Sequence, residues 1–497
     1  MLKSIKKILI ANRGEIANRI IRSAHDLDIA TVSIYSEVDS TSPHVLLARQ
    51  SIGIGGILSS ESYLDIDKII NACKVTGADA VHPGYGFLSE NAEFARRCEA
   101  ENIIFIGPNA ETISIMGDKL SAKKKVTEFN VPLVPGMDLA ITDLNSAMNI
   151  ADEIGYPVMI KASAGGGGKG IRIVYDKMDF KDEMKRAMSE SKSSFGSDQV
   201  FIEKFILAPK HIEVQIIGDQ YGNYAALFER DCSIQRRNQK VIEEAPCSLL
   251  TDSKRKEICA LAIKVAESCN YVGAGTVEFI ADQSFNFYFL EMNTRLQVEH
   301  PVTEQITSVD LVKEQIKVAM GEPLSINNKT LKINGHSIEV RIYAEDPANN
   351  FLPDVGKLTT YKIPKGPGIR VDDGFEEGMN IPIQYDPMIA KLISHGSNRE
   401  EARKRMLRAI DEYKISGIET TLGFCKFALE HPLFIDGTFT TSFVSEHFTP
   451  DLLTKSLDHD EEIVAAIVAI NGYNEMKSFS KTTPKQNPSN WKSRSKK

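Results

Sequence analysis

Two glutamates, Glu278 and Glu291, are spaced so that their carboxylates could meet. The stretch that contains them, GTVEFIADQSFNFYFLEMN, has the pattern of two strands joined by a turn. A register that pairs 278 with 291, 280 with 289 and 282 with 287 would set their Cβ atoms about 5 Å apart. Two carboxylates that close repel each other unless a cation lies between them. The spacing therefore predicts a Mg²⁺ site that shares its ion with substrate phosphates, with a solvated charged pair or a shifted register as the alternatives.

The chain after Glu291 carries a polar residue at every second position. If it stays extended, these residues share one face, because side chains alternate along a strand. The face would then hold a metal ligand pair, an anion-binding arginine and a further carboxylate able to act as a base. An ordinary half-buried strand also alternates, but seldom with this concentration of reactive groups. The residues are Glu291, Asn293, Arg295, Gln297 and Glu299.

A run of four glycines, 165–168, lies between the apolar segments PVMIK and IRIVY, with Lys161 and Lys169 beside it. Glycine lets the backbone approach a ligand closely, and successive N–H groups can cradle phosphate oxygens. The run is not a Walker A loop, because G-x-x-x-x-G-K-[ST] is missing and a strand follows it. We predict a mobile phosphate-covering lid that orders when nucleotide binds; a plain flexible turn is the alternative.

Two further charged clusters lie in the second half of the chain. The segment 229–240 packs both signs of charge around one predicted loop, and in 337–346 the residues Glu339, Arg341 and Tyr343 would share a strand face. Each pattern fits a site or a solvated ladder of ion pairs equally well.

The elements that must position these groups fall into several regions. Residues 6–115 alternate the apolar runs KKILIA, TVSIYS, DAVHP and NIIFIGP with helical stretches, which predicts an open, mostly parallel α/β sheet. Its strand ends would present Asn12–Glu15 and His82–Gly86, as ligand contacts or as tight turns. Residues 133–206 predict a compact piece of strands and helices around the glycines. From 207 to about 449 the alternating strands predict an antiparallel sheet with one covered face.

The C-terminal region differs in composition from the rest. The segment 460–470 predicts a short amphipathic helix. Residues 474–497 carry seven Lys or Arg against one Glu, which predicts a solvated, disordered arm.

Composition sets the broad class. The 497 residues are 42% apolar and 25% charged with a net charge of −8, which excludes a wholly disordered chain and gives no overall electrostatic case for nucleic acid. The seven cysteines form no Cys-x-x-Cys pair, which favours a reducing, cytoplasmic setting. No apolar run approaches the roughly 18 residues of a membrane span, so we expect no membrane association.

Taken together, these segments resemble biotin carboxylase, of the ATP-grasp superfamily. The resemblance runs in order from about residue 5 to 447. The motifs that carry it are KILIANRGEIA, HPGYGFLSEN, FIGP, MGDK, KASAGGGGKG, ERDCSIQRRNQKVIEEAP, EMNTRLQVEHPVTE, RIYAEDP and YDPMIAKLI.

The resemblance implies a division into domains. Residues 1–118 would form the N-terminal domain, 119–330 an ATP-grasp domain with a lid at about 133–206, and 331–449 a C-terminal antiparallel domain, followed by the helix and tail of 450–497. It also implies a ligase that uses ATP with Mg²⁺ or Mn²⁺ to activate bicarbonate as carboxyphosphate, and then carboxylates biotin carried on a separate protein.

The resemblance further implies roles for individual residues. Glu278, Glu291 and Asn293 would hold the metal. Lys240, Arg295, Gln297 and the backbone of Val298 would bind bicarbonate, Glu299 would deprotonate it, and Arg341 would stabilise the biotin enolate. The nucleotide contacts would be Lys119, Lys161, Gly167, Gly168, Glu203, Lys204, Phe205, Ile206, His211, Asn238, Glu278 and Glu291, although Asn238 stands where many members have His.

No biotin-attachment domain or transferase region is recognisable in the sequence. The resemblance therefore implies one component of a multisubunit carboxylase, a homodimer working with a biotin carboxyl carrier protein and a carboxyltransferase subunit. Acetyl- or propionyl-CoA is the expected final acceptor, and the biotin-carboxylating component of a two-subunit pyruvate carboxylase is the near alternative. An ATP-grasp ligase that joins a carboxylate to an amine, and a non-catalytic scaffold, are more remote. The presence of Lys240, Arg295, Glu299 and Arg341 argues against the scaffold.

Overall fold

The computed structural model describes residues 4–136, 141, 143–162, 171–195, 200–237, 239–453 and 459–479. The chain divides into two compact units, Met1–Phe448 and Thr449–Lys497.

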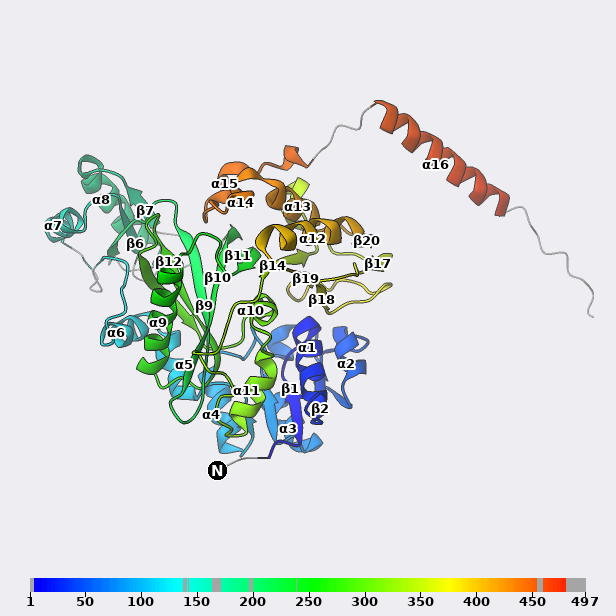
Figure 1. The fold of residues 1–497 in the computed structure, drawn as a ribbon, viewed down its shortest axis with the longest axis horizontal. Helices are drawn as coiled ribbons and strands as arrows, with labels where there is room; N and C mark the ends of the chain where they lie inside the picture. Colours follow the sequence, from blue (N-terminus) through cyan, green and yellow to red (C-terminus); the bar gives the residue numbers. More distant parts are fainter. Residues whose placement is uncertain are drawn as a thin grey trace, which may run out of the picture. The chain divides into compact units, whose positions relative to one another are not determined.

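The N-terminal sheet has five strands in the order β3-β2-β1-β4-β5, and every pairing is parallel. The predicted open parallel sheet is therefore confirmed (Figure 1, blue). Strand β3 was not predicted, because its sequence QSIG is largely exposed at the sheet edge and has no apolar run. The elements are β1 Lys7–Ile10, α1 Gly14–His25, β2 Ala30–Tyr35, η1 Glu37–Asp39, α2 Pro43–Leu47, β3 Gln50–Gly53, η2 Ser59–Glu61, α3 Ile66–Thr76, β4 Ala80–His82, α4 Ala92–Ala100, β5 Ile104–Phe105 and α5 Ala110–Gly117.

A small antiparallel sheet, in the order β7-β6-β8, forms the compact piece predicted around the glycine run. Its own apolar core joins the strands to the helices α7 and α8, through residues such as Ile160, Phe180 and Ile202. The glycines 165–168 lie outside the described residues. The elements are α6 Lys119–Thr127, α7 Leu144–Ile154, β6 Val158–Ala162, β7 Ile171–Val174, α8 Lys177–Phe195 and β8 Val200–Lys204.

A large antiparallel sheet, in the order β13-β12-β9-β10-β11-β14-β19-β18, joins the segments from 210 to 396. All its pairings are antiparallel, as predicted. Helix α9 packs on β9 and β10, and α12 packs on β14 and β19 (Figure 1). The elements are β9 Lys210–Gly218, β10 Tyr224–Arg236, β11 Gln239–Ala245, α9 Asp252–Ser268, β12 Gly273–Ala281, β13 Phe287–Asn293, α10 His300–Thr307, α11 Leu311–Ala319, β14 His336–Tyr343, β18 Ile369–Asp373, β19 Met388–Gly396 and α12 Arg399–Glu412.

Shorter elements complete the first unit around the core of β14, β19 and α12. They are β15 Glu345–Asp346, η3 Pro347–Asn349, β16 Leu352–Pro353, β17 Thr360–Lys362, β20 Lys414–Ser416, α13 Leu422–Glu430, α14 Pro432–Ile435 and α15 Phe443–His447.

The second unit contains η4 Pro450–Leu452 and the helix α16 His459–Phe479. Residues 480–497 lie outside the described residues. The helix predicted at 460–470 is present as α16, but it extends to Phe479, so the prediction of a disordered arm is wrong for 474–479. Its apolar residues, Ile463, Val464, Ile467, Val468, Ile470 and Tyr473, are exposed. Within the described part of the chain, none of the helices combines the length and apolar character that a membrane crossing requires.

A buried ion-pair cluster ties β11 to β14 and α12. Glu244 accepts hydrogen bonds from Arg399 Nε at 2.7 Å and from the ring of His336 at 3.2 Å. Burial alone would raise the pKa of Glu244, but the hydrogen bond from His336 and the charge of Arg399 lower it to about 2. A carboxyl group whose pKa falls on folding stabilises the protein above its unfolded pKa, and this contribution is lost as the pH falls toward the folded value.

We therefore expect Glu244→Gln to lower the free energy of unfolding by about 3 kcal/mol near neutral pH, the free-energy equivalent of that pKa shift. The gap to the wild type should narrow as the pH falls below about 4.3, the pKa of an unfolded glutamate. Urea unfolding of both proteins at about pH 7 and about pH 3.5 measures the gap. A gap of the same size at both pH values would contradict this assignment.

Candidate active site

Strands β12 and β13 form the predicted hairpin, and Glu278 pairs with Glu291. The rest of the predicted register is wrong. Ile280 pairs with Tyr288 and Ala281 with Phe287, and an irregularity follows Glu278. The turn is tighter than predicted, because the Asp282 carboxylate accepts from the N–H groups of Ser284 and Asn286. A bulge restores the opposition of the two glutamates.

A lysine from β11 lies at the centre of the carboxylates. Lys240 Nζ is 2.8 Å from Glu278 Oε1 and 2.7 Å from Glu299 Oε1, and it also contacts Glu213. Burial would lower the pKa of this ammonium group, but the three carboxylates raise it well above its usual value. Lys240 therefore carries a fixed positive charge between the predicted metal ligands and the predicted base.

Glu299 lies in the turn that enters helix α10, and it is 1% exposed. Arg341 from β14 donates to its second oxygen at 2.9 Å. Burial would raise the pKa of Glu299, but Lys240 and Arg341 hold it well below its usual range. The carboxylate is thus ionised at neutral pH and can accept a proton.

The predicted extended face after Glu291 is only partly correct. Strand β13 ends at Asn293, and the chain then turns toward α10. Asn293 and Gln297 still reach the cluster, each donating to Glu278 Oε1, at 2.8 and 2.7 Å. Arg295 instead donates to Glu90 at 2.8 Å and to Asn293 Oδ1 at 3.0 Å. The turn, rather than a strand, brings Glu299 to Lys240.

Two central residues are Arg230 and Glu213. Glu213 was missed in the sequence, and Arg230 was noted only as one charge of 229–240, which was predicted to be a loop but contains the end of β10 and the start of β11. Arg230 is fully buried on β10, and it donates to Glu213 and Gln215 of β9 and to Gln297. For Glu213 a signal was available, because β9 alternates the polar residues 211, 213 and 215 with the apolar residues 212, 214 and 216. The guanidinium bonds to Gln297 and so joins the loop before α10 to the sheet.

The carboxylate pair fits a divalent cation. Glu278 is already engaged by Lys240 and by His211 Nε2 at 2.9 Å. Burial would raise the pKa of Glu278, but these two partners hold it well below its usual range. In Glu291, burial and the nearby charge of Glu278 raise the pKa. Mg²⁺ would relieve the repulsion between two opposed carboxylates of this kind. The amide nitrogen of Asn293 faces Glu278, and its oxygen accepts from Arg295.

The predicted nucleotide contacts are divided between the small sheet and the large sheet. Lys161 of β6 and Lys123 both bond to Glu203 of β8, the second at 2.9 Å. The Lys204 ammonium group donates to the carbonyls of Gly155 and Tyr156, so it is held within the small sheet. Lys119 begins helix α6, Phe205 and Ile206 follow β8, and His211 contacts Glu278. Gly167, Gly168 and Asn238 lie outside the described residues.

A cavity of about 470 Å³ adjoins the cluster. Arg295, Val298 and Arg341 line it, together with the N-terminal turns around Asn12–Ile16 and Tyr85–Phe87. Of the strand face predicted in 337–346, Arg341 and Tyr343 line this cavity, while Glu339 is buried.

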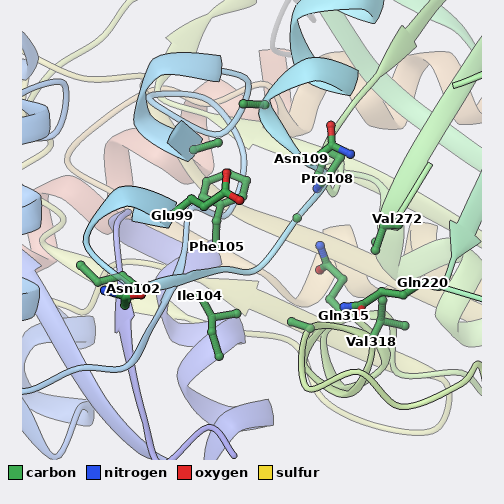
Figure 2. A pocket seen from close by; sticks show the side chains of 16 residues that line it. Glu99, Asn102, Ile104, Phe105, Pro108, Asn109, Gln220, Val272, Gln315 and Val318 are labelled. Carbon is green, nitrogen blue, oxygen red and sulfur yellow. The ribbon is translucent and has the colours of Figure 1, made fainter. Parts of the chain in front are cut away.

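A second cavity, of about 600 Å³, lies apart from the predicted site residues. Figure 2 shows Glu99 and Phe105 on one side of it and Gln220 and Gln315 on the other. Among the described residues that line it, Glu99 alone is charged. A lining without lysine or arginine offers no counter-charge to a triphosphate, so the smaller cavity is the better candidate for the reaction.

The small sheet that flanks the glycine run and the carboxylate-bearing antiparallel sheet form the arrangement expected of an ATP-grasp ligase. Three family models match the chain. They are the biotin carboxylase N-terminal domain at residues 4–113, the carbamoyl-phosphate synthase L chain ATP-binding domain at 118–327 and the biotin carboxylase C-terminal domain at 339–446.

Individual relatives agree with these models. Biotin carboxylase 1 of Bacillus subtilis is 49% identical over 444 residues, which cover 89% of this chain and 99% of that protein. The mitochondrial propionyl-CoA carboxylase alpha chain of Sus scrofa is 50% identical over 92% of this chain, but the match spans 63% of that longer protein. One similar crystal structure is that of the biotin carboxylase domain dimer of the Hydrogenobacter thermophilus 2-oxoglutarate carboxylase, in complex with MgADP, ADP and bicarbonate. Its TM-score is 0.83 and its sequence identity is 47%. The match covers 91% of this chain and 100% of that one. The chain belongs to the biotin carboxylase family.

Proposed function

We propose that this chain carboxylates biotin on a separate carrier protein, using ATP and bicarbonate. The observation that carries the proposal is the position of Lys240. Its ammonium group bonds both to Glu278, one of the proposed metal ligands, and to Glu299, the proposed base. The Lys240 ammonium group thereby joins the phosphate end of the site to the bicarbonate end. The solved relative that holds MgADP and bicarbonate supports this pairing of substrates.

Bicarbonate would bind between the ammonium group of Lys240 and the turn before α10. Arg295, Gln297 and the backbone N–H of Val298 are the further proposed donors. Glu299 would take the bicarbonate proton, and the resulting dianion would attack the γ-phosphorus of ATP to form carboxyphosphate and ADP. The low pKa of Glu299 keeps it ionised before the substrate arrives, and a bound anion beside it would raise that pKa toward the value a base needs.

Glu278, Glu291 and Asn293 would hold Mg²⁺ or Mn²⁺, which neutralises phosphate charge when bound. Lys119, Lys161, Glu203–Ile206 and His211 are the proposed nucleotide contacts among the described residues, and Gly167, Gly168 and Asn238 are proposed as contacts from the sequence alone. The pairing of Lys161 with Glu203 links that lysine, on the central strand β6 of the small sheet, to β8.

Arg341 would act on biotin in the cavity of about 470 Å³. Loss of the N1 proton places negative charge on the ureido oxygen of biotin, and a guanidinium aimed at that oxygen stabilises the charge as it develops. Arg341 is suited to this because Glu243, at 2.6 Å, and Glu299, at 2.9 Å, fix its orientation.

We further propose three domains with the boundaries 1–118, 119–330 and 331–449, a homodimer, and partners that comprise a biotin carboxyl carrier protein and a carboxyltransferase subunit. The transferase would select the acceptor, for which the propionyl-CoA carboxylase relatives favour an acyl-CoA. Identification of the transferase that co-purifies with the chain tests this part. Seven unpaired cysteines among the described residues support a cytoplasmic location.

The activity itself is tested by ADP release from the purified chain with MgATP and free biotin. We expect release to depend on added bicarbonate and to rise further with biotin. ATP turnover that neither bicarbonate nor biotin changes would refute the proposed function and favour another ATP-grasp ligase.

A further inference from the structure

A buried lysine outside the proposed machinery, Lys391 of β19, contacts the turn that carries the proposed base. Its side chain is 0% exposed. Its ammonium group donates to the carbonyl of Val298 at 2.9 Å and lies 3.1 Å from Glu15 Oε1 at the start of α1. Asp372 is farther away, at 3.9 Å, and is already bonded twice by Arg370. Glu15 and the Val298 carbonyl are therefore its two close partners.

The Val298 carbonyl belongs to the peptide that leads directly into Glu299. The carbonyls on either side of it serve the backbone of the turn, since Gln297 accepts from the N–H of His300 and Glu299 from that of Val302, both at 3.3 Å. Among the described residues, the donor to the Val298 carbonyl is Lys391. If this bond is lost, the peptide is free to rotate, and the Glu299 N–H and the Glu299 carboxylate move with it.

Glu15 in turn is fixed from the N-terminal sheet. Tyr85 donates to the same oxygen, Glu15 Oε1, that faces Lys391. The two N-terminal turns noted in the sequence, Asn12–Glu15 and His82–Gly86, thus meet the turn before α10 through one ammonium group. A buried lysine needs such a partner, because an unpaired charge in the interior is strongly unfavourable.

We propose that Lys391 is a positioning residue for bicarbonate activation, which it supports by fixing the Val298–Glu299 peptide. This inference rests on the proposed function. Glu15 holds the lysine in place, and Tyr85 orients Glu15. Lys391 itself touches no reacting atom.

The test is steady-state kinetics of the full chain with MgATP, bicarbonate and free biotin. Lys391→Met should raise the bicarbonate KM about 10- to 100-fold, as is typical when an outer partner of a ligand-binding group is removed. The ATP KM should change by less than about twofold, because the bond lies at the bicarbonate end.

A double variant separates positioning from simple charge balance. Lys391→Met leaves Glu15 buried without its cation and should lower the thermal midpoint, whereas Lys391→Met/Glu15→Gln removes both charges and should restore it. The bicarbonate KM should stay high in the double variant, which can be measured even if the single variant does not fold. Lys210→Met is the matched control, since Lys210 is also buried and paired, with Asp231 at 2.7 Å, and it should lose stability without the rise in bicarbonate KM.

The outcomes are distinct. A wild-type chain with no bicarbonate-dependent turnover overturns the proposed function itself. A wild-type chain that turns over, together with a double variant whose bicarbonate KM returns to normal along with its thermal midpoint, overturns the positioning role alone. A bicarbonate KM that stays high in the stable double variant supports it.

Discussion

Replacement of Glu299 by glutamine should reduce bicarbonate-dependent ATP turnover by about 10²- to 10⁴-fold, the usual worth of a positioned general base. The amide keeps the size of the side chain and one oxygen for Lys240 or Arg341, but it cannot take the bicarbonate proton. ADP binding should be unchanged, because Glu299 is not among the proposed nucleotide contacts. Initial rates of ADP release and an ADP-binding titration measure the two effects.

Glu244→Gln serves as the matched control for Glu299→Gln. It also neutralises a buried, ion-paired glutamate of the same unit, but one that does not line the cavity. Stability should fall in this control while turnover per folded molecule stays near that of the wild type. Equal turnover in Glu299→Gln and the wild type would exclude Glu299 as the base.

Replacement of Lys240 by methionine should have the second large effect, on both activity and stability. Removal of one partner from a buried ion pair costs about 3–5 kcal/mol, and here Glu213, Glu278 and Glu299 would all lose the same cation. Turnover should fall by about 10²- to 10³-fold, as it does when a preorganised donor to a developing charge is lost.

The pH dependence identifies the cause of the Lys240→Met defect. Without the cation, the pKa values of Glu278 and Glu299 should rise above those of the unfolded chain, so these groups would destabilise the folded state increasingly as the pH rises. Urea unfolding at about pH 5.5 and about pH 8 should show a larger deficit at the higher pH. Lys240→Arg keeps the charge and should show a smaller deficit; a deficit independent of pH would mean that lost packing, rather than charge, is responsible.

The sequence predicted those parts of the fold that depend on local patterns. Alternating apolar runs were enough for the parallel N-terminal sheet and for the antiparallel sheet that follows it. The edge strand β3 was missed, since an exposed strand has little hydrophobic pattern to detect. The length of α16 was underestimated because its last turns are polar and have the composition of a solvated tail.

In the candidate site, too, local pairings could be predicted from the sequence, whereas tertiary contacts could not. The opposition of Glu278 and Glu291 was predicted correctly, but from a register that a tight Asx turn and a bulge alter. Arg230 and Lys391 could not be placed from spacing, because their partners lie far away in the chain and meet them only through tertiary packing. Pairings of this kind are set by which strands become neighbours, which local periodicity does not specify.

In the proposed reaction, Glu299 and Lys240 direct bicarbonate onto the terminal phosphate of ATP. Turnover with ¹⁸O-labelled bicarbonate and free biotin, followed by mass analysis of the inorganic phosphate, tests it most directly. Attack by a bicarbonate oxygen on phosphorus predicts that labelled oxygen appears in the phosphate, and that the label is lost together with turnover in Glu299→Gln. Unlabelled phosphate from a chain that actively turns over ATP would show that water, rather than bicarbonate, attacks the phosphorus, and would exclude the proposed reaction.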